Sequence, residues 1–214
     1  MRFERHSGRA CRPEIGAVVL AAGQSRRMGE QNKLLTPWLG STLVEHVVDE
    51  AMASDAQTVC VVTGHEGDRV ASLLTDRPVV IVRNPEYAEG MASSLRSGVR
   101  VLPQSTDGIL VCLGDMPLVQ AGHLDRLIAA FSQQDSRGIC IPTYTGRRGN
   151  PVLLSVEFRR EIACLEGDRG ARGLITARPE VITEVPVDDP SVLIDIDTPA
   201  SLQSIQLAYG NPDT

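Results

Sequence analysis

Short apolar runs alternate with longer segments of mixed character from residue 15 to the end of the chain. The runs are rich in valine, isoleucine and leucine and are bounded by glycine, proline or polar residues, which is typical of buried strands. They predict strands at residues 15–21, 57–63, 78–82, 108–113, 138–142, 151–154, 181–187 and 192–196.

The segments between the predicted strands repeat their apolar residues at helical spacing. In the segment STLVEHVVDEAMAS, Thr42 and Glu45 have the spacing of a capping box at a helix start. One face of that segment carries Leu43, Val44, Val47, Val48, Ala51 and Met52. Two later stripes consist of Met91, Leu95, Val99 and Leu102, and of Leu124, Leu127, Ile128 and Phe131. Such stripes indicate helix faces packed on a core, so we do not interpret them as binding grooves.

Strands that alternate with helices are expected to form a mostly parallel sheet covered on both faces. No repeat, low-complexity tract or long linker divides the sequence, which therefore predicts a single doubly wound, Rossmann-like α/β domain over residues 15–210. Residues 1–14 are predicted to be a disordered extension. In such a sheet, ligands bind beyond the carboxyl ends of the strands, so a functional residue is expected just after a strand.

Composition limits the kinds of ligand and the compartment. The formal net charge of -6 disfavours a general nucleic-acid surface, so any anion site is expected to be local. The cysteines have neither zinc-site nor disulfide-framework spacing and are predicted to be buried thiols in a reducing compartment. No apolar run approaches the length of a membrane span, and the Arg-rich start lacks the apolar segment of a secretory signal. These features predict a cytoplasmic protein without a membrane partner.

The segment LAAGQSRRMGEQNK, residues 20–33, follows the first predicted strand and contains both glycines and cations. A loop that leaves a strand and enters a helix exposes backbone N–H groups to a phosphate. The segment matches neither the P-loop pattern nor the G-x-G-x-x-G pattern of dinucleotide-binding folds. Arg26, Arg27 and Lys33 add positive charge near this turn, which favours a polyphosphate ligand.

Carboxylates follow two later predicted strands. Asp115 comes directly after the run GILVCLG, and Asp195 and Asp197 would share one face of an extended strand. Magnesium prefers one or two carboxylates together with phosphate oxygens, so both places are candidates for metal ligands. Each also has a plainer interpretation. Asp115 is then a turn residue before a proline, and Asp197 caps a helix that starts at Pro199, a role that Thr198 can equally fill.

Several segments together carry a resemblance to a known family. LAAGQSRRMGEQNKLL is similar to the L-A-A-G-x-S-x-R-M-G-x(n)-K signature of the MobA-like nucleotidyltransferases, and within them of the molybdenum cofactor cytidylyltransferases. Further segments resemble that family in the same order, namely NPEYAEGMASSLRSG, GDMPLV, RGNPVLL, GDRGAR and DIDTP. Ordered matches between residues 15 and 200 carry much more weight than any single one of them.

The resemblance implies a Mg²⁺-dependent transfer of CMP from CTP to the terminal phosphate of molybdopterin or its molybdenum form, with release of pyrophosphate. It implies that Asp115 and Asp197 hold the metal, and that Arg27, Lys33 and Asp115 act in catalysis. The residues implied to contact the nucleotide are Ala21, Ala22, Gly23, Ser25, Arg27, Lys33, Gly90, Met91, Ser93, Ser94 and Asp115. In the plainer interpretation, Ser93 or Ser94 only caps a helix.

The predicted binding site for the phosphate of the acceptor substrate consists of arginines in two glycine-containing loops. These are Arg147, Arg148, Arg169 and Arg172, of which Arg148 and Arg172 fall on family motif positions. Each is equally compatible with a solvated surface side chain. The resemblance also allows a receiving molybdoenzyme as a partner. No histidine has a carboxylate or cysteine at ligand spacing in the sequence, which disfavours a zinc site and a histidine-dependent triad.

Other functions share parts of this pattern. Guanylyl relatives typically carry A-G-G where this chain has Ala21-Ala22-Gly23, so the resemblance favours CTP over GTP. Enzymes that act on methylerythritol phosphate or on sugar phosphates share the first loop, but GMASSL and GDMPLV resemble the molybdopterin group more. A non-catalytic molybdopterin carrier or insertion chaperone is the alternative from another class. The presence of Lys33 and of both acidic positions favours an enzyme.

Overall fold

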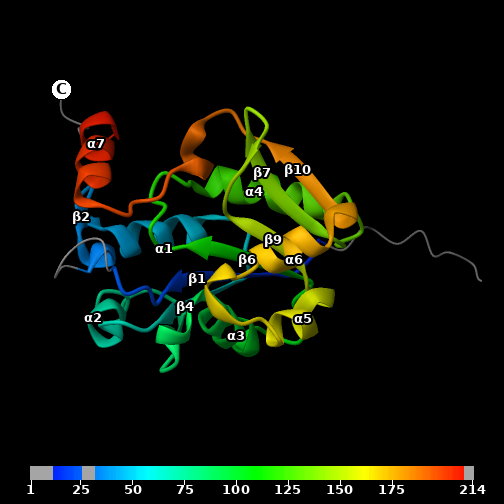
Figure 1. Ribbon diagram of the computed structural model, residues 1–214, viewed down its shortest axis with the longest axis horizontal. Coiled ribbons are helices and arrows are strands. Elements are labelled where there is room, and N and C mark those ends of the chain that lie inside the picture. Colours follow the sequence, from blue (N-terminus) through cyan, green and yellow to red (C-terminus); the bar gives the residue numbers. More distant parts are fainter. Residues whose placement is uncertain (1–11, 26–31, 210–214) are drawn as a thin grey trace, which may run out of the picture.

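The computed structural model describes residues 12–25 and 32–209. Most of the predicted extension at residues 1–14 therefore lies outside the described residues, as does Arg27 of the predicted phosphate loop. The described chain forms a large, mostly parallel sheet with helices on both faces (Figure 1). This arrangement confirms the predicted α/β class.

The large sheet has the strand order β10-β7-β9-β6-β1-β4-β5, and β8 pairs with the end of β7. Its strands are β1 (Ile15–Ala21), β4 (Thr58–Thr63), β5 (Val80–Arg83), β6 (Gly108–Leu113), β7 (Ile139–Tyr144), β8 (Arg147–Arg148), β9 (Val152–Ser155) and β10 (Ile182–Pro186). Neighbouring strands are parallel except where β8 or β9 takes part. A short hairpin of β2 (Pro37–Trp38) and β3 (Ser41–Thr42) forms a separate sheet.

Helices cover the two faces of the sheet unequally. They are α1 (Leu43–Ala53), α2 (Gly67–Ser72), α3 (Met91–Val101), α4 (Ala121–Ser132), α5 (Arg159–Ala163), α6 (Arg172–Ala177) and α7 (Pro199–Tyr209). The cores place α1 and α4 on one face and α3, α5 and α6 on the other. None of the helices in the described ranges is long and apolar enough to cross a membrane.

The central strands bury side chains on both faces. In β1, Ala17 and Val19 pack into the core beneath α1 and α4, whereas Val18 packs into the core beneath α3. Successive side chains of a strand point to opposite faces, so a strand covered on both sides needs an unbroken apolar run. This requirement explains why the predicted strands were continuous apolar runs and not alternating ones.

The prediction of a strand at residues 192–196 is wrong, whereas each of the other predicted runs overlaps an observed strand. Pro190 opens the 3-10 turn η6 (Pro190–Leu193), and the Asp189 carboxylate accepts a hydrogen bond from the backbone N–H of Ser191 at 2.9 Å. Strand β9 already occupies the place beside β6. The segment after η6 is instead tied to the end of β6, because the backbone N–H of Ile196 donates to the carbonyl of Asp115 at 2.9 Å.

The predicted helix starts and core faces are mostly confirmed. The Thr42 side chain accepts from the backbone N–H of Glu45, and the Glu45 carboxylate accepts from the backbone N–H of Thr42, so the capping box is complete. The stripe on α4 is fully buried. Met91 differs from the rest of its stripe because its side chain is 40% exposed at the start of α3.

Three of the described cysteines, Cys60, Cys112 and Cys140, are buried and free, as predicted. Burial raises the pKa of the Cys112 thiol to about 12, so it stays protonated and unreactive at neutral pH. Cys164 contradicts the prediction, since it is exposed. It is the C-cap residue of α5.

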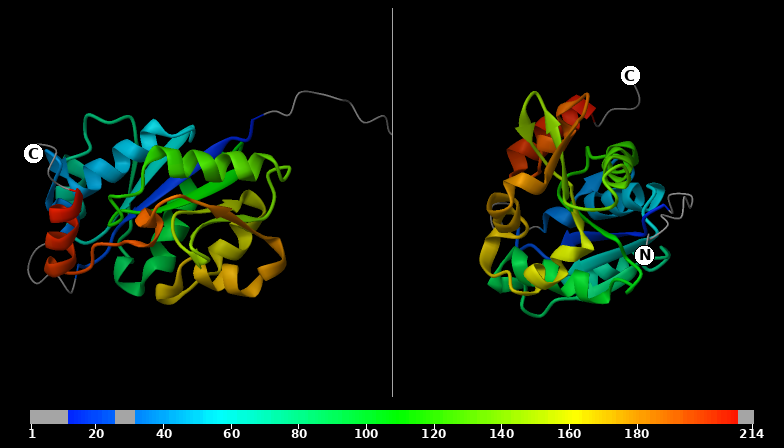
Figure 2. Two further views of the ribbon diagram at one scale, coloured as in Figure 1. Left: turned by 90° about the horizontal axis from the view of Figure 1, so that it is seen from above. Right: turned by 90° about the vertical axis from the view of Figure 1, so that its right-hand side faces the viewer.

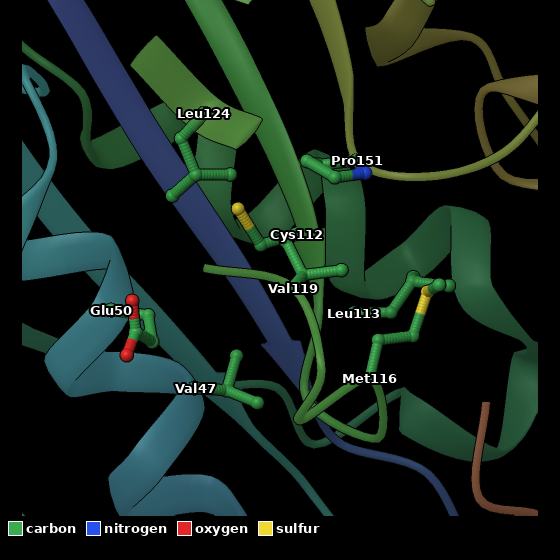
Figure 3. Close-up of a pocket in the computed structure, with 8 residues that line it drawn as sticks. All are labelled: Val47, Glu50, Cys112, Leu113, Met116, Val119, Leu124 and Pro151. Atoms are coloured by element: carbon green, nitrogen blue, oxygen red, sulfur yellow. The ribbon is translucent and has the colours of Figure 1, made fainter. Parts of the chain in front are cut away.

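A small cavity separates α1 from the end of β6 and the start of α4 (Figure 3). Its volume is only about 10 Å³, at the limit for a single water. The one carboxylate in its lining, Glu50, accepts a hydrogen bond from the backbone N–H of Ala121 at 2.7 Å and so helps to cap α4. This cavity is therefore a packing gap and not a ligand site.

Candidate active site

The predicted site lies at the carboxyl ends of β1 and β6, where the strand order changes direction. From β1 the chain proceeds through β4 to β5 on one side, and from β6 it builds the other side of the sheet. Doubly wound folds bind their ligands at such a switch point. In Figure 2, β1 runs toward the end of the molecule at which α7 lies. A cleft of about 450 Å³ opens beyond β1.

The cleft brings together most of the residues predicted for the site. Those that line it are Ala22, Gly23, Ser25, Lys33, Gly90, Met91, Ser94, Asp115 and Asp197. Ala21 and Ser93 are each 1% exposed and are not part of the lining. Residues that are distant in sequence therefore meet in one place.

The loop after β1 is held by two polar side chains. The Ser25 hydroxyl accepts a hydrogen bond from the backbone N–H of Lys33 at 3.1 Å. The Asn32 carboxamide caps the turn η1 (Lys33–Leu35) by accepting from the backbone N–H of Leu34, and its amide donates to the carbonyl of His65 at 3.4 Å. Asn32 is 4% exposed, so it fixes the place at which Lys33 enters the cleft.

Lys33 makes two ion pairs inside the cleft. Its Nζ donates to Asp115 Oδ2 at 2.6 Å and to Asp197 Oδ1 at 2.9 Å, and only 13% of its side chain is exposed. Burial by itself would lower the pKa of the ammonium, but the two carboxylates outweigh burial and hold the pKa of Lys33 above its ordinary value. Lys33 is therefore charged at neutral pH.

The segment 195–197 reaches Asp115 although it is not a strand. The hydrogen bond from Ile196 to the Asp115 carbonyl places Asp195 and Asp197 on either side of a buried isoleucine. The start of α7 is capped by Thr198, whose hydroxyl accepts from the backbone N–H of Ser201 at 3.1 Å. This contact assigns to Thr198 the capping role that Asp197 was also considered for.

Asp115, Asp195 and Asp197 form an acidic cluster suited to a divalent cation. Each offers a carboxylate oxygen, and these oxygens all lie within 4.8 Å of one another. Asp115 Oδ1 is buried and has no hydrogen-bond partner in the described part of the chain. Carboxylate oxygens are the ligands that hard cations such as Mg²⁺ and Mn²⁺ take. The donor set therefore fits such an ion, with Asp195 added to the two positions predicted.

The opposite wall of the cleft is made by close backbone contact. Gly90 has φ +113°, and a Cβ there would lie 2.5 Å from Asp168 Oδ1 and 2.6 Å from the backbone of Gly167. A Cβ on Gly170 would likewise lie 2.7 Å from the sulfur of Met91. We call this pair of contacts between the start of α3 and the 167–170 turn the glycine contact. It fixes Asp168 in the lining of the cleft.

The two predicted serines have different positions. Asn84 donates to Ser93 Oγ at 2.9 Å and to Ser94 Oγ at 3.0 Å. The Ser93 hydroxyl also donates to the carbonyls of Glu86 and Gly90, so it joins the turn before α3 to the helix. Ser94 is the one that reaches the cleft. Ser93 therefore supports the wall of the cleft from behind.

The predicted acceptor arginines are not in the described lining of the cleft. Arg148 lies on β8 and forms an ion pair with Glu184, with 2.8 Å between Nε and Oε1. Arg172 is exposed at the start of α6. The GDRGAR motif contributes Asp168 to the cleft lining, whereas its arginines were the residues predicted to contact a substrate.

Two other residues of the site were missed. Tyr87 lines the cleft, and its Cβ lies 2.5 Å from the place of a Cβ on Gly64, so Gly64 allows the ring to pack there. Asn32 organises the loop as described above. The sequence gives a signal for Asn32, because asparagine before a short helical turn is a common cap. No local pattern marks Tyr87, since its neighbour Gly64 is distant in sequence.

One histidine does pair with a carboxylate, which the sequence spacing did not indicate. His123 Nε2 lies 3.0 Å from Asp189 Oδ2, while His123 Nδ1 accepts from the backbone N–H of Gln120. Both ring nitrogens are thus engaged at the start of α4, and His123 is 7% exposed. The pair is structural and lies apart from the residues that line the cleft.

A comparison with protein families agrees with this geometry. The model of the MobA-like NTP transferase domain matches residues 17–181, which run from within β1 to just beyond α6 and include Lys33 and Asp115 but not Asp197. The chain therefore belongs to the MobA-like NTP transferase domain family. Its fold and family support a transferase that acts on nucleotides.

Named relatives differ in activity. The chain is 30% identical to nicotine blue oxidoreductase of Paenarthrobacter nicotinovorans, over 87% of this chain and 93% of that protein. It is 26% identical to molybdenum cofactor cytidylyltransferase of Escherichia coli K12, over 86% of this chain and 92% of that protein. It is also similar to the crystal structure of Rv0371C of Mycobacterium tuberculosis H37Rv in complex with manganese. That match has a TM-score of 0.78 and 25% identity, and covers 92% of this chain and 100% of the other.

Proposed function

We propose that the protein is a divalent-metal-dependent cytidylyltransferase that joins CMP from CTP to the terminal phosphate of molybdopterin or its molybdenum form. The observation that carries the proposal is the meeting of Lys33, Asp115 and Asp197 beside the loop after β1. A cation and two carboxylates at a strand-end phosphate loop suit a metal-bound triphosphate better than an uncharged ligand. The cytidylyltransferase relative supports the choice of substrates.

The metal part of the proposal rests on the acidic cluster. Asp115 and Asp197 would hold the ion, and Oδ1 of Asp115, which has no hydrogen-bond partner among the described residues, offers an oxygen to it. The manganese complex of the Rv0371C structure supports a divalent ion in this fold, and we propose Mg²⁺ as the ion in this chain. When bound, such an ion neutralises phosphate charge and polarises the phosphorus–oxygen bonds.

The reaction needs positioning and charge compensation more than a nucleophilic side chain. An oxygen of the acceptor phosphate forms a bond to the α-phosphorus of CTP, and the bond from that phosphorus to the bridging oxygen of pyrophosphate breaks. Backbone N–H groups at Ala22, Gly23 and Ser25 are proposed to hold the triphosphate. Lys33, together with Arg27, is proposed to offset the negative charge that gathers on the leaving pyrophosphate.

The proposed preference for CTP rests on Ala22 and the wall opposite it. Ala22 is 5% exposed and lines the cleft, and its Cβ lies 2.9 Å from the place of a Cβ on Gly64. A methyl group there limits how closely a base or ribose approaches the backbone, compared with glycine. Gly90, Met91 and Ser94 are proposed to bound the base and ribose on the other side. Delivery of the product to a molybdoenzyme is part of the same proposal.

The test is pyrophosphate release by the purified full-length protein with Mg²⁺ and molybdopterin, using CTP, GTP or ATP. We expect release from CTP to be much faster than from GTP or ATP, to require the pterin, and to stop with a chelator. Equal rates of pyrophosphate release from CTP and GTP would contradict the proposed preference for CTP. Binding of pterin without any turnover would favour the carrier interpretation.

The oxidoreductase relative supports a second candidate function, reduction of a pigment related to nicotine blue. Reduction of a pigment needs no metal-bound triphosphate, so we expect it not to depend on the acidic cluster. Absorbance of nicotine blue in the presence of a nicotinamide reductant would follow it. Bleaching that persists in a chelator and in Asp115→Asn, combined with no pyrophosphate release, would favour this candidate over cytidylyl transfer.

A further inference from the structure

The Lys33 ammonium contacts two of the three residues of the acidic cluster that would hold a metal ion. Its Nζ contacts Asp115 Oδ2 and Asp197 Oδ1, and both residues belong to the group of carboxylates suited to a cation. A divalent ion of this kind takes its oxygen ligands at about 2.0–2.2 Å. The ammonium and the ion therefore compete for oxygens of the same two residues within a space less than 5 Å across.

Electrostatics makes this competition strong. Like charges a few ångströms apart repel strongly where little water screens them, and the Lys33 side chain is only 13% exposed. In the described part of the chain, Lys33 supplies positive charge to this cluster of three carboxylates. An ion that took Asp115 Oδ2 or Asp197 Oδ1 would displace Lys33, and the displaced ammonium would then need another anion.

That anion is available in the same cleft. Lys33 begins the turn η1, and its backbone N–H is fixed to the Ser25 hydroxyl at the end of the described phosphate loop. Its side chain and the loop residues Gly23 and Ser25 line one cavity. The long, unbranched lysine chain can turn from the carboxylates to a phosphate without movement of its backbone.

Composition agrees with a special role for this side chain. Lys33 is the only lysine in the sequence, and every other basic side chain apart from histidine is arginine. Lysine carries a compact charge on a flexible stem. Arginine forms planar, bidentate ion pairs with carboxylates, which are harder to break in exchange for another partner. A charge that must move between two partners suits lysine.

We infer that, before nucleotide binds, Lys33 pairs with the metal-binding carboxylates and so opposes metal binding. The nucleotide phosphates draw Lys33 away from Asp115 and Asp197, and the divalent ion enters with them. This inference rests on the proposed function, since it assigns the order of events at that site. It requires that nucleotide and metal each increase the affinity of the protein for the other.

The first test measures binding of Mn²⁺ alone, by electron paramagnetic resonance, to wild-type protein and to Lys33→Met. Methionine keeps much of the length of the side chain and removes its charge. We expect Lys33→Met to bind Mn²⁺ at least ~10-fold more tightly than wild type when no nucleotide is present. Lys33→Arg, which keeps the charge, should bind Mn²⁺ no more tightly than wild type does.

Arg126→Met is the matched control, because Arg126 pairs with the exposed Asp188 and is not among the residues that line the cleft. It removes one positive charge elsewhere and should leave Mn²⁺ affinity unchanged. Equal affinity in Lys33→Met and wild type would overturn the inference, and so would equal tightening in Arg126→Met. Neither result would bear on cytidylyl transfer, which the pyrophosphate assay tests separately.

A second measurement needs no variant and so does not depend on how well a variant folds. Protein grown with ¹³C-lysine carries a label at one residue only. We expect the ε-carbon resonance of Lys33 to shift when Mg²⁺ and CTP bind together, with binding followed by calorimetry in the same buffer. An unchanged resonance in a sample that binds both ligands would contradict the exchange.

Discussion

The cleft has an acidic cluster on one side and the glycine contact on the other, and the two are held by different forces. Asp115, Asp195 and Asp197 repel one another and are compensated by Lys33. Gly90 and the 167–170 turn, which includes the Asp168 carboxylate, fit together so closely that a Cβ on Gly90 has no room. We expect the first arrangement to change when an ion or a phosphate binds, and the second to keep its shape.

This difference separates what the site does from what shapes it. Clustered like charges reduce stability, and proteins keep them where a ligand relieves the repulsion. Backbone in a conformation that only glycine tolerates also has a cost, but it sets a fixed shape. We therefore expect changes to the acidic cluster to reduce turnover while the fold persists, and changes to the glycine contact to reduce stability as well.

The largest effect is expected from Asp115→Asn. It removes a carboxylate charge from the cluster at a residue with nearly the same volume, so turnover should fall by at least ~100-fold, the scale of losing a positioned electrostatic group. Pyrophosphate release gives the rate, and circular dichroism with thermal melting checks the fold. A rate near that of wild type would exclude a metal role for Asp115.

Gly90→Ala should act through stability. The backbone conformation and the contact with Gly167 together should lower the free energy of unfolding by roughly 3 kcal/mol, measured by urea denaturation. Gly146→Ala is the matched control, because Gly146 has φ +77° but no atom within 4 Å of an added Cβ. Gly146→Ala should lower the free energy of unfolding by only roughly 1 kcal/mol. Equal losses would show that the contact itself contributes nothing.

Ala22→Gly tests whether one methyl group selects the nucleotide. Removal of the methyl from the lining of the cleft should shift the ratio of kcat/KM for CTP to that for GTP by about 10-fold toward GTP, the scale of one methylene in a pocket. Steady-state rates with each nucleotide provide the ratio. If the ratio does not move, the selection of CTP lies elsewhere in the cleft.

The smallest effects are expected from the two serines, which form a matched pair. Ser93→Ala should lower the free energy of unfolding by about 1–2 kcal/mol, because buried partners lose hydrogen bonds, and should leave nucleotide affinity nearly unchanged. Ser94→Ala should weaken nucleotide binding by about 5-fold. Calorimetry and melting on both variants separate the two. The reverse pattern would mean that Ser93 reaches the ligand.

Much of the fold follows from local patterns in the sequence. Apolar runs predict β1, β4 and β6 because strands covered on both faces must be apolar throughout. The α1 capping box was visible because both its residues are local. The strand predicted at 192–196 failed for a non-local reason, since β9 takes the place beside β6. A run of apolar residues does not show whether another strand already occupies the neighbouring position in the sheet.

The same distinction applies to the site. Asp115 and Lys33 were predictable because each follows a strand or lies in a recognisable loop. The direct contact between them, across residues far apart in the chain, was not. Asp168 was not predicted because only the arginines of its motif were considered as binding residues. Its position in the cleft depends on the close fit of Gly90 to Gly167. The sequence shows the glycines that such close backbone contacts require, but it does not show which residues those glycines contact.

The central claim is that the acidic cluster binds a metal-bound nucleotide. Calorimetric titration of CTP into wild-type protein and Asp115→Asn, each with Mg²⁺ and with a chelator, tests it most directly. We predict that Mg²⁺ strengthens binding of CTP to wild type by at least ~10-fold, and that this gain disappears in Asp115→Asn. Equal binding of CTP to wild type with Mg²⁺ and with the chelator would contradict the claim.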